Sequence, residues 1–219
     1  MSVIFFDIET GPLGQGEIAA MMPPFNRADV KVGNLGPEKA AQKIMEAETS
    51  YWSDFYEKAA LDPLTGQVLA IGLVYADSGE FVILGPERDE ARTLRDFWQI
   101  CRAEMGRINQ MVGFNSHLFD LPFLIRRSWK HRIQIPAGVR RGRYWGEQIV
   151  DLREYWQLGD RQARGSLGSI GLHLGVGGKN GDGKDFARLW DEDPLAASQY
   201  LRNDLELTVK VAEAMGMLV

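Results

Sequence analysis

The sequence predicts an α/β fold in which one mixed β-sheet is flanked by α-helices. Two early apolar segments are joined by a tight-turn signal, which indicates an antiparallel hairpin. Later apolar segments alternate with helical ones, which indicates crossover connections between strands. Helices in such connections cover the faces of the sheet. We therefore expect one sheet that contains both directions of pairing, with helices on its faces.

The N-terminal half is predicted to hold three strands and two helices. The first strand is an apolar run that ends in acids, and Asp77-Ser78-Gly79 joins the next two. The first helix contains good helix formers and no internal Gly or Pro, and the second is amphipathic. A segment rich in Gly and Pro is interpreted as a long surface loop. In chain order the elements are strand 2–8, loop 12–37, helix 38–60, strands 67–75 and 80–84, and helix 88–105.

The C-terminal half alternates strands with helices. Its strands are short apolar runs, and its last helix is marked by a capping residue, Asp193, followed by Pro194 at the first helical position. A loop rich in Gly and Lys precedes that helix. In chain order the elements are strand 110–113, helix 118–129, strand 148–152, helix 166–174, loop 175–184 and helix 194–215.

The bulk composition suits a single domain over residues 1–219, because no repeat or apolar-poor linker divides the chain. Cys101, the one cysteine, excludes an internal disulfide and is expected to be buried, which fits a reducing cytoplasm. No apolar run approaches the roughly 20 residues that span a membrane. The N-terminus has no basic region typical of a secretory signal. We expect a cytoplasmic protein without membrane contact.

The charge is unevenly distributed along this acidic chain. The net charge is −5, but residues 126–164 contain ten Lys or Arg and four Asp or Glu, a local balance of +6. A basic segment can follow a phosphate backbone. A solvated, arginine-rich loop explains the same charge equally well.

Asp7 and Glu9 are the sharpest chemical feature. They lie in the segment 5–11, Phe-Phe-Asp-Ile-Glu-Thr-Gly, and two positions apart on a strand they point to the same face. Neighbouring acids repel each other and resist burial, which a hard divalent cation resolves. The simpler alternative is a pair of acids at a frayed strand end.

Two further acids stand in settings that suit the same chemistry. Asp120 lies among apolar residues where a helix begins, in Asn-Ser-His-Leu-Phe-Asp-Leu-Pro over 115–122. Tyr200 and Asp204 are four residues apart on the last helix and share one face. Each has a simpler explanation alone, a helix-start acid for Asp120 and an amphipathic helix edge for the other pair.

Together, Asp-x-Glu, Asn-x-x-x-Phe-Asp and Tyr-x-x-x-Asp resemble the three exonuclease motifs of the DEDD superfamily, which has a ribonuclease H-like fold. The tyrosine-type branch (DEDDy) fits, because the histidine-type branch places His where this chain has Gln199. The motifs look most like the proofreading exonuclease domain of family B DNA polymerases and its free-standing relatives. The resemblance also includes residues 150–152 and 166–175, with Gly178-Lys179 after them, and is weakest over 12–66.

The resemblance implies a metal-dependent 3′-5′ exonuclease that acts on the 3′ end of single-stranded DNA and releases mononucleotides. Two divalent ions, Mg²⁺ or Mn²⁺, would be bound by four acids and would supply a two-metal-ion mechanism. Tyr200 would orient the attacking water. The implied metal ligands are Asp7, Glu9, Asp120 and Asp204, and the implied contacts to the terminal nucleotides are Thr10, Asn115 and Phe119.

Several alternatives and exclusions accompany this interpretation. An exoribonuclease of the same fold fits the same motifs, since recognition of a 2′-hydroxyl leaves no short motif. A nuclease-like module that binds nucleic acid without catalysis is the rival from another class. The loop 175–184 lacks the Gly-Lys-Ser/Thr ending of a phosphate-binding loop, so no nucleoside triphosphate is expected. Phe119 could be plain core packing, and Asp151 is interpreted as structural.

Overall fold

The computed structural model describes residues 2–104, 108–137, 139, 148–160, 162–179, 183 and 186–217. Its sheet has five strands in the order β3-β2-β1-β4-β5. β1 pairs with β4 and β4 with β5 in parallel, whereas β2 and β3 form an antiparallel hairpin. The mixed sheet predicted from the sequence is therefore confirmed. The strands are β1 (Ser2–Pro12), β2 (Gly66–Tyr75), β3 (Phe81–Leu84), β4 (Ile108–Gly113) and β5 (Ile149–Asp151).

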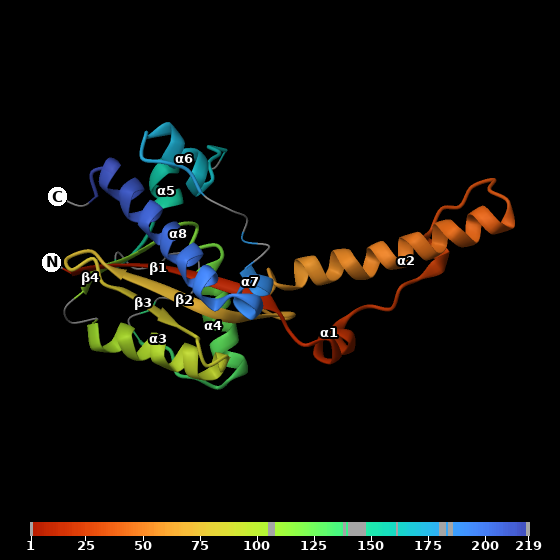
Figure 1. The fold of residues 1–219 in the computed structure, drawn as a ribbon, viewed down its shortest axis with the longest axis horizontal. Helices are drawn as coiled ribbons and strands as arrows, with labels where there is room; N and C mark the ends of the chain where they lie inside the picture. Colours follow the sequence, from red (N-terminus) through yellow and green to blue (C-terminus); the bar gives the residue numbers. More distant parts are fainter. Residues whose placement is uncertain are drawn as a thin grey trace. The chain divides into compact units, whose positions relative to one another are not determined.

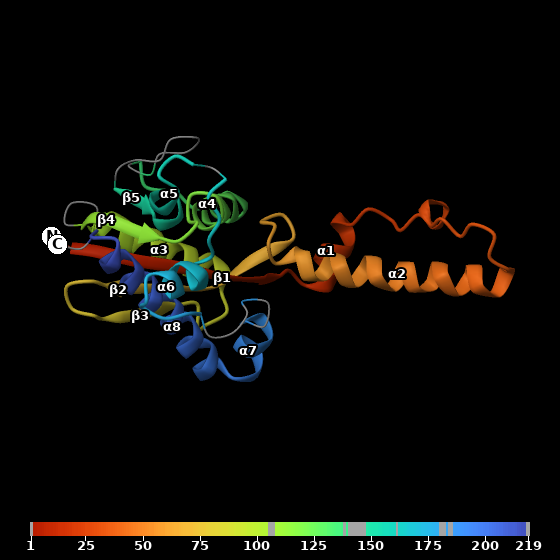
Figure 2. The ribbon, with the colours of Figure 1, turned by 90° about the horizontal axis from the view of Figure 1, so that it is seen from above.

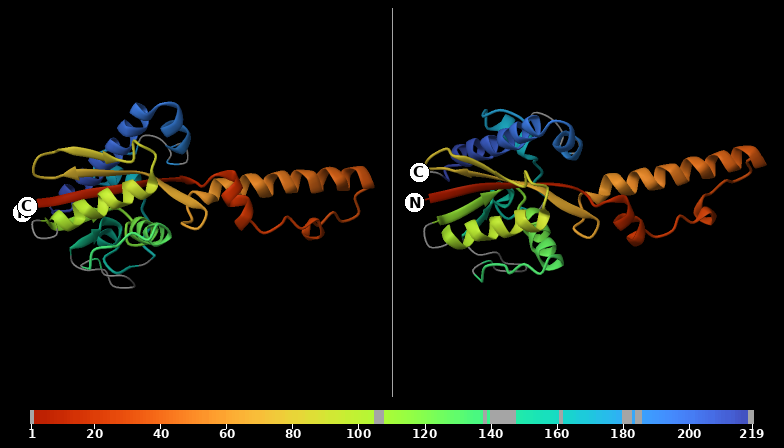
Figure 3. Two further views of the ribbon diagram at one scale, coloured as in Figure 1. Left: turned by 90° about the horizontal axis from the view of Figure 1, so that it is seen from below. Right: turned by 60° about the horizontal axis from the view of Figure 1, so that its bottom comes forward.

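Alternating residues of β1 divide the hydrophobic core into two layers, one on each face of the sheet. Ile4, Phe6 and Ile8 pack against two helices on one face, while Phe5 points into the cluster on the opposite face. Figures 1 and 3 show these helical layers on opposite sides of the strands. The first layer contains α3 (Glu90–Glu104) and α4 (Asp120–Lys130), and the second α5 (Leu152–Gln157), α6 (Leu167–His173), α7 (Phe186–Glu192) and α8 (Pro194–Ala214).

The packing in the second layer brings the last helix onto the centre of the sheet. Leu201 and Leu205 of α8 are fully buried, and a Cβ added to Gly72 of β2 would come within 2.8 Å of both side chains. A larger residue at this position of β2 would therefore force α8 away from the sheet. Figure 2, which looks onto this layer, shows α6 and α8 in front of the strands.

The chain divides into two compact units, residues 1–10 with 68–219, and residues 11–67. The second unit contains α1 (Gln15–Met21), a 3₁₀ turn η1 (Arg27–Asp29) and the long helix α2 (Pro37–Ala59). It has a small core of its own, made by Leu13, Ile18, Met22 and Ala59 with four aromatic side chains of α2. That residues 1–219 form a single domain stays a prediction.

Most predicted elements are found, and the differences concern short segments. β1 continues to Pro12 rather than ending at residue 8, and α1 and η1 lie in the segment interpreted as loop. α5 and α7 were not predicted, because a helix of six or seven residues is too short for clear periodicity. Part of the basic segment lies outside the described residues, including Arg140, Arg141, Arg143 and Arg161. In the described part of the chain, none of the helices combines the length and hydropathy that crossing a bilayer requires.

Candidate functional site

Three acids from opposite ends of the chain meet on the α8 side of β1. Asp7 and Glu9 alternate with Phe6 and Ile8, so they share the face of Phe5, which α8 covers. Asp204 lies on α8 and is 2% exposed. One carboxylate oxygen of each of the three acids lies within 4.8 Å of the others.

Asp120 joins this group from the other helical layer. It is the first residue of α4, is 3% exposed, and its Oδ1 accepts a hydrogen bond of 3.2 Å from the backbone N–H of Ile8. The carboxyl groups of Asp120 and Asp7 also act on each other, since the charge of Asp7 raises the pKa of Asp120. Asp7 is therefore the acid that interacts with both sides of the group. We call Asp7, Glu9, Asp120 and Asp204 the acid cluster.

Burial makes the acid cluster electrostatically unfavourable without a cation. Desolvation, reinforced by the charge of Asp204, raises the pKa of Asp7 from 3.8 to about 7. Desolvation and the charge of Asp7 raise the pKa values of Glu9 and Asp120 well above their usual range. The pKa of Asp204 is raised by desolvation as well, although Lys179 opposes this. Buried acids that hold their protons this strongly are typical of functional sites.

Tyr200 and Lys179 complete the site on the side of Asp204. Lys179 Nζ lies 2.7 Å from Asp204 Oδ2 and 5.2 Å from the centre of the Tyr200 ring. The Tyr200 hydroxyl is buried, and within the described residues no group gives it a well-formed hydrogen bond. Desolvation holds its pKa above the usual value, so the hydroxyl is protonated at neutral pH. In the sequence, Gly178-Lys179 belongs to the resemblance described above, but no spacing rule connects Lys179 with Asp204.

The three residues predicted to contact nucleotides lie near the acid cluster in sequence. Thr10 follows Glu9 on β1 and is partly buried. Asn115 has a left-handed backbone (φ 60°), and its Oδ1 accepts a hydrogen bond of 2.9 Å from Arg153. Phe119 precedes Asp120 and packs on Phe123, with ring centres 5.6 Å apart. The packing of Phe119 fits the simpler explanation from the sequence as well as a contact to a base.

Asp151 anchors the loop that leads to Asp120. Its carboxylate accepts hydrogen bonds from the backbone N–H groups of Asn115, His117 and Arg153, at 2.8 to 2.9 Å. His117, Asp151 and Glu154 also place ligand atoms within 4.8 Å of one another. These atoms already hold the loop, since His117 Nδ1 lies 2.8 Å from Glu154. This second group therefore has a structural explanation.

The donors of the acid cluster suit a divalent cation. All four are carboxylates, the ligands that Mg²⁺ and Mn²⁺ prefer. Their raised pKa values show that positive charge is needed to hold them ionised together. The unsatisfied hydroxyl of Tyr200 adds a polar group on the same helix face as Asp204. The residues present therefore fit a divalent metal site.

Comparisons with known proteins place this geometry in context. A family model described as "predicted 3′-5′ exonuclease related to the exonuclease domain of PolB" matches residues 61–208. The match includes Asp120, Tyr200 and Asp204, and it begins after Asp7 and Glu9. No curated protein matches the chain.

Among solved structures, the chain is similar to the family B DNA polymerase of the hyperthermophilic archaeon Pyrobaculum calidifontis. The identity is 19% and the TM-score 0.62, over 97% of this chain and 24% of the polymerase. The chain thus spans about a quarter of that protein's length. At this identity the likeness concerns the fold alone, and it confirms the predicted ribonuclease H-like architecture.

Proposed function

Because the chain belongs to the family of predicted 3′-5′ exonucleases related to the exonuclease domain of PolB, we propose that it removes mononucleotides from the 3′ end of single-stranded DNA. The observation that carries this proposal is the meeting of Asp7, Glu9 and Asp204, with oxygens within 4.8 Å of one another. Asp120 extends the group through its hydrogen bond from Ile8. Hydrolysis of a phosphodiester by two metal ions requires such a concentration of hard oxygen ligands.

The acid cluster would hold two divalent ions, Mg²⁺ or Mn²⁺. Bound there, the two ions would acidify a water molecule, neutralise the phosphate and stabilise the leaving oxygen. Asp7 is suited to a shared position, because it interacts with Asp120 on one side and lies near Glu9 and Asp204 on the other. Glu9 and Asp204 would complete the ligand set on the α8 side.

Tyr200 would position the attacking water rather than take its proton. Its pKa is raised by desolvation, which excludes a tyrosinate base at neutral pH. Its hydroxyl is one helical turn from Asp204 and has unused hydrogen-bonding capacity among the described residues. A protonated hydroxyl can accept or donate one hydrogen bond to water and so orient it.

The terminal nucleotides would contact Thr10, Asn115 and Phe119. A base can stack on the half-buried ring of Phe119, a contact worth about 1–3 kcal/mol per base and tolerant of sequence. Asn115 and Phe119 lie on the loop anchored by Asp151, which would keep them in register with Asp120. We place the protein in the cytoplasm, in keeping with its one buried thiol.

The test is incubation of the full chain with 5′-labelled single-stranded DNA and RNA in Mg²⁺, Mn²⁺ or EDTA. We expect a ladder of shortening DNA products with either metal and none in EDTA. Immediate release of the label as a mononucleotide would show the opposite polarity. Faster cleavage of RNA would identify an exoribonuclease, and binding without cleavage would identify a nuclease-like binding module.

Substitutions in the acid cluster test whether cleavage depends on this site. Asp204→Ala should abolish cleavage without unfolding the protein, because it relieves repulsion among the acids and the Lys179 ammonium group that it releases is partly exposed to water. Glu213→Ala is the matched control, an exposed acid on the same helix. Cleavage by Asp204→Ala at the wild-type rate would exclude the site.

A further inference from the structure

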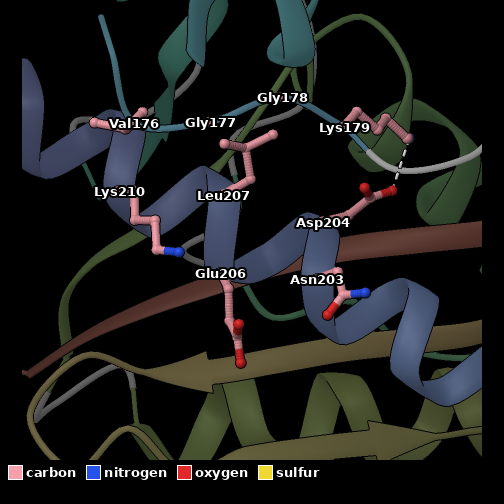
Figure 4. A pocket seen from close by; sticks show the side chains of 9 residues that line it. All are labelled: Val176, Gly177, Gly178, Lys179, Asn203, Asp204, Glu206, Leu207 and Lys210. Carbon is pink, nitrogen blue, oxygen red and sulfur yellow. Dashed lines mark ion pairs between the residues drawn. The ribbon is translucent and has the colours of Figure 1, made fainter. Parts of the chain in front are cut away.

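Lys179 brings a positive charge into direct contact with the acid cluster. Its Nζ lies 2.7 Å from Oδ2 of Asp204, and Figure 4 shows the side chain extended toward that carboxylate. The Asp204 side chain is 3% exposed, whereas that of Lys179 is 35% exposed. The lysine therefore reaches from the solvent side into the buried group.

The backbone of Lys179 is held in place by glycines of α6. A Cβ added to Gly168 would come within 3.1 to 3.2 Å of Lys179 Cβ and N. A Cβ added to Gly171 would come within 2.5 Å of the carbonyl oxygen of Gly177. The loop 177–179 therefore lies so close to Gly168 and Gly171 of α6 that a side chain at either position would displace it. The position of the ammonium group is a consequence of this close packing.

The charge of Lys179 acts on more than one acid. Its proximity lowers the pKa values of Asp7 and Glu9, in addition to that of Asp204, against the larger effect of desolvation. Burial disfavours the ammonium form of Lys179, but Asp204 and Tyr200 outweigh this and hold its pKa above the usual value. The lysine is consequently charged whenever the site is ready to bind a metal ion.

We propose that Lys179 is the resident counter-cation of the acid cluster: its ammonium group holds Oδ2 of Asp204 until a divalent ion binds, and then leaves that oxygen. This inference rests on the metal site proposed above. Two cations on one carboxylate oxygen repel each other strongly in a buried site. Lys179 therefore competes with the metal and sets the affinity of the site for it.

The structure has room for the displaced ammonium group. A cavity of about 170 Å³ adjoins Asp204, lined by residues 176–179 of the loop and by Asn203, Glu206 and Lys210 of α8. Lys179 itself lines this cavity and its side chain is 35% exposed, so the ammonium group can turn from Asp204 into water there. The lysine can thus leave Asp204 without a rearrangement of the helix.

The test compares binding of Mn²⁺ alone to the wild-type chain, Lys179→Met and Lys179→Arg by calorimetry, with thermal unfolding in EDTA. We expect Lys179→Met to bind Mn²⁺ at least about tenfold more tightly, because a charged contact no longer competes. Its metal-free form should unfold at a lower temperature than wild type. Lys179→Arg keeps the charge and should stay near wild type in both measurements.

A second measurement uses the wild-type chain and does not depend on any variant folding. Acetylation of lysines, followed by mass spectrometry, should modify Lys179 several-fold faster in Mg²⁺ than in EDTA. Lys210, an exposed residue of the same cavity, is the internal control and should react equally in both.

Unchanged or weaker Mn²⁺ binding by Lys179→Met would overturn the proposal, as would equal acetylation of Lys179 in Mg²⁺ and EDTA. Either result, with normal Mn²⁺ binding by wild type, leaves the proposed nuclease function intact. Absence of Mn²⁺ binding by wild type would overturn the metal site and this proposal together.

Discussion

Replacing Asp7 by Asn should stabilise the metal-free protein at pH 8 more than at pH 5. Asn resembles a protonated Asp in size and in its hydrogen-bonding groups, so the change removes mainly the negative charge. Folding raises the pKa of Asp7 from 3.8 to about 7. The folded form therefore binds this proton more tightly than the unfolded form. The stability that this proton confers is complete below pH 3.8 and is lost as the pH rises through 7.

The size of the effect depends on how much of the interval from pH 3.8 to about 7 lies between the two pH values of the experiment, 5 and 8. Between pH 5 and 8, only the part from pH 5 to about 7 contributes, which is about two pH units. At about 1.4 kcal/mol per unit, the loss of wild-type stability is at most about 3 kcal/mol. Water around the partly exposed side chain and relaxation of its neighbours reduce this value. We expect the advantage of Asp7→Asn over wild type to grow by at least about 1 kcal/mol, or about 2–4 °C in Tm.

The assay is thermal and urea unfolding in EDTA at both pH values. Asp77→Asn is the matched control, since the same substitution is made at an exposed turn of unit 1–10 with 68–219. A stability difference between Asp7→Asn and wild type that is the same at pH 5 and pH 8 would refute the reasoning. So would a metal-free Asp7→Asn protein that is less stable than wild type at pH 8.

Three other substitutions test separate parts of the structure. Tyr200→Phe should slow single-turnover cleavage about 10- to 100-fold, since only a positioning hydroxyl is lost. Binding of Mn²⁺ should stay nearly unchanged. A wild-type cleavage rate would mean that the Tyr200 ring serves packing alone. Asp151→Ala should lower the free energy of unfolding in urea by about 2–4 kcal/mol, because three backbone N–H groups lose their acceptor; a loss below about 1 kcal/mol would contradict the anchoring role. Glu90→Gln should lower the free energy of unfolding by about 3 kcal/mol in the same assay, because the Arg127 side chain, 3% exposed, loses the carboxylate that it pairs with. Glu87 is exposed, so Glu87→Gln should change the free energy of unfolding little. Equal effects of the two substitutions would contradict this role of Glu90.

The parts of the fold with regular periodicity were predictable from the sequence. β1 alternates apolar residues with Asp7 and Glu9, and this period of two led directly to their common face. The spacing of Tyr200 and Asp204 likewise placed both on one side of α8. The order of the hairpin and the later crossovers was enough to predict a mixed sheet.

The remaining parts depend on contacts between residues far apart in the chain. The segment 12–37 contains many Gly and Pro, yet Ile18 and Met22 find apolar partners in α2 and stabilise the short helix α1. Lys179 reaches Asp204 because Gly168 and Gly171 admit its loop against α6. Neither relationship has a local signature, since it arises only when the helices pack.

The acid cluster draws on both ends of the chain, with Asp7 near the start and Asp204 fifteen residues before Val219. During synthesis the N-terminal strand leaves the ribosome long before α8 exists. A chain without α8 has neither Asp204 nor Tyr200 and therefore lacks a ligand and the positioning hydroxyl of the proposed mechanism. The acids meet only when α8 docks onto the sheet. Recovery of cleavage during refolding should therefore coincide with the slowest structural phase, the closure of contacts between distant segments.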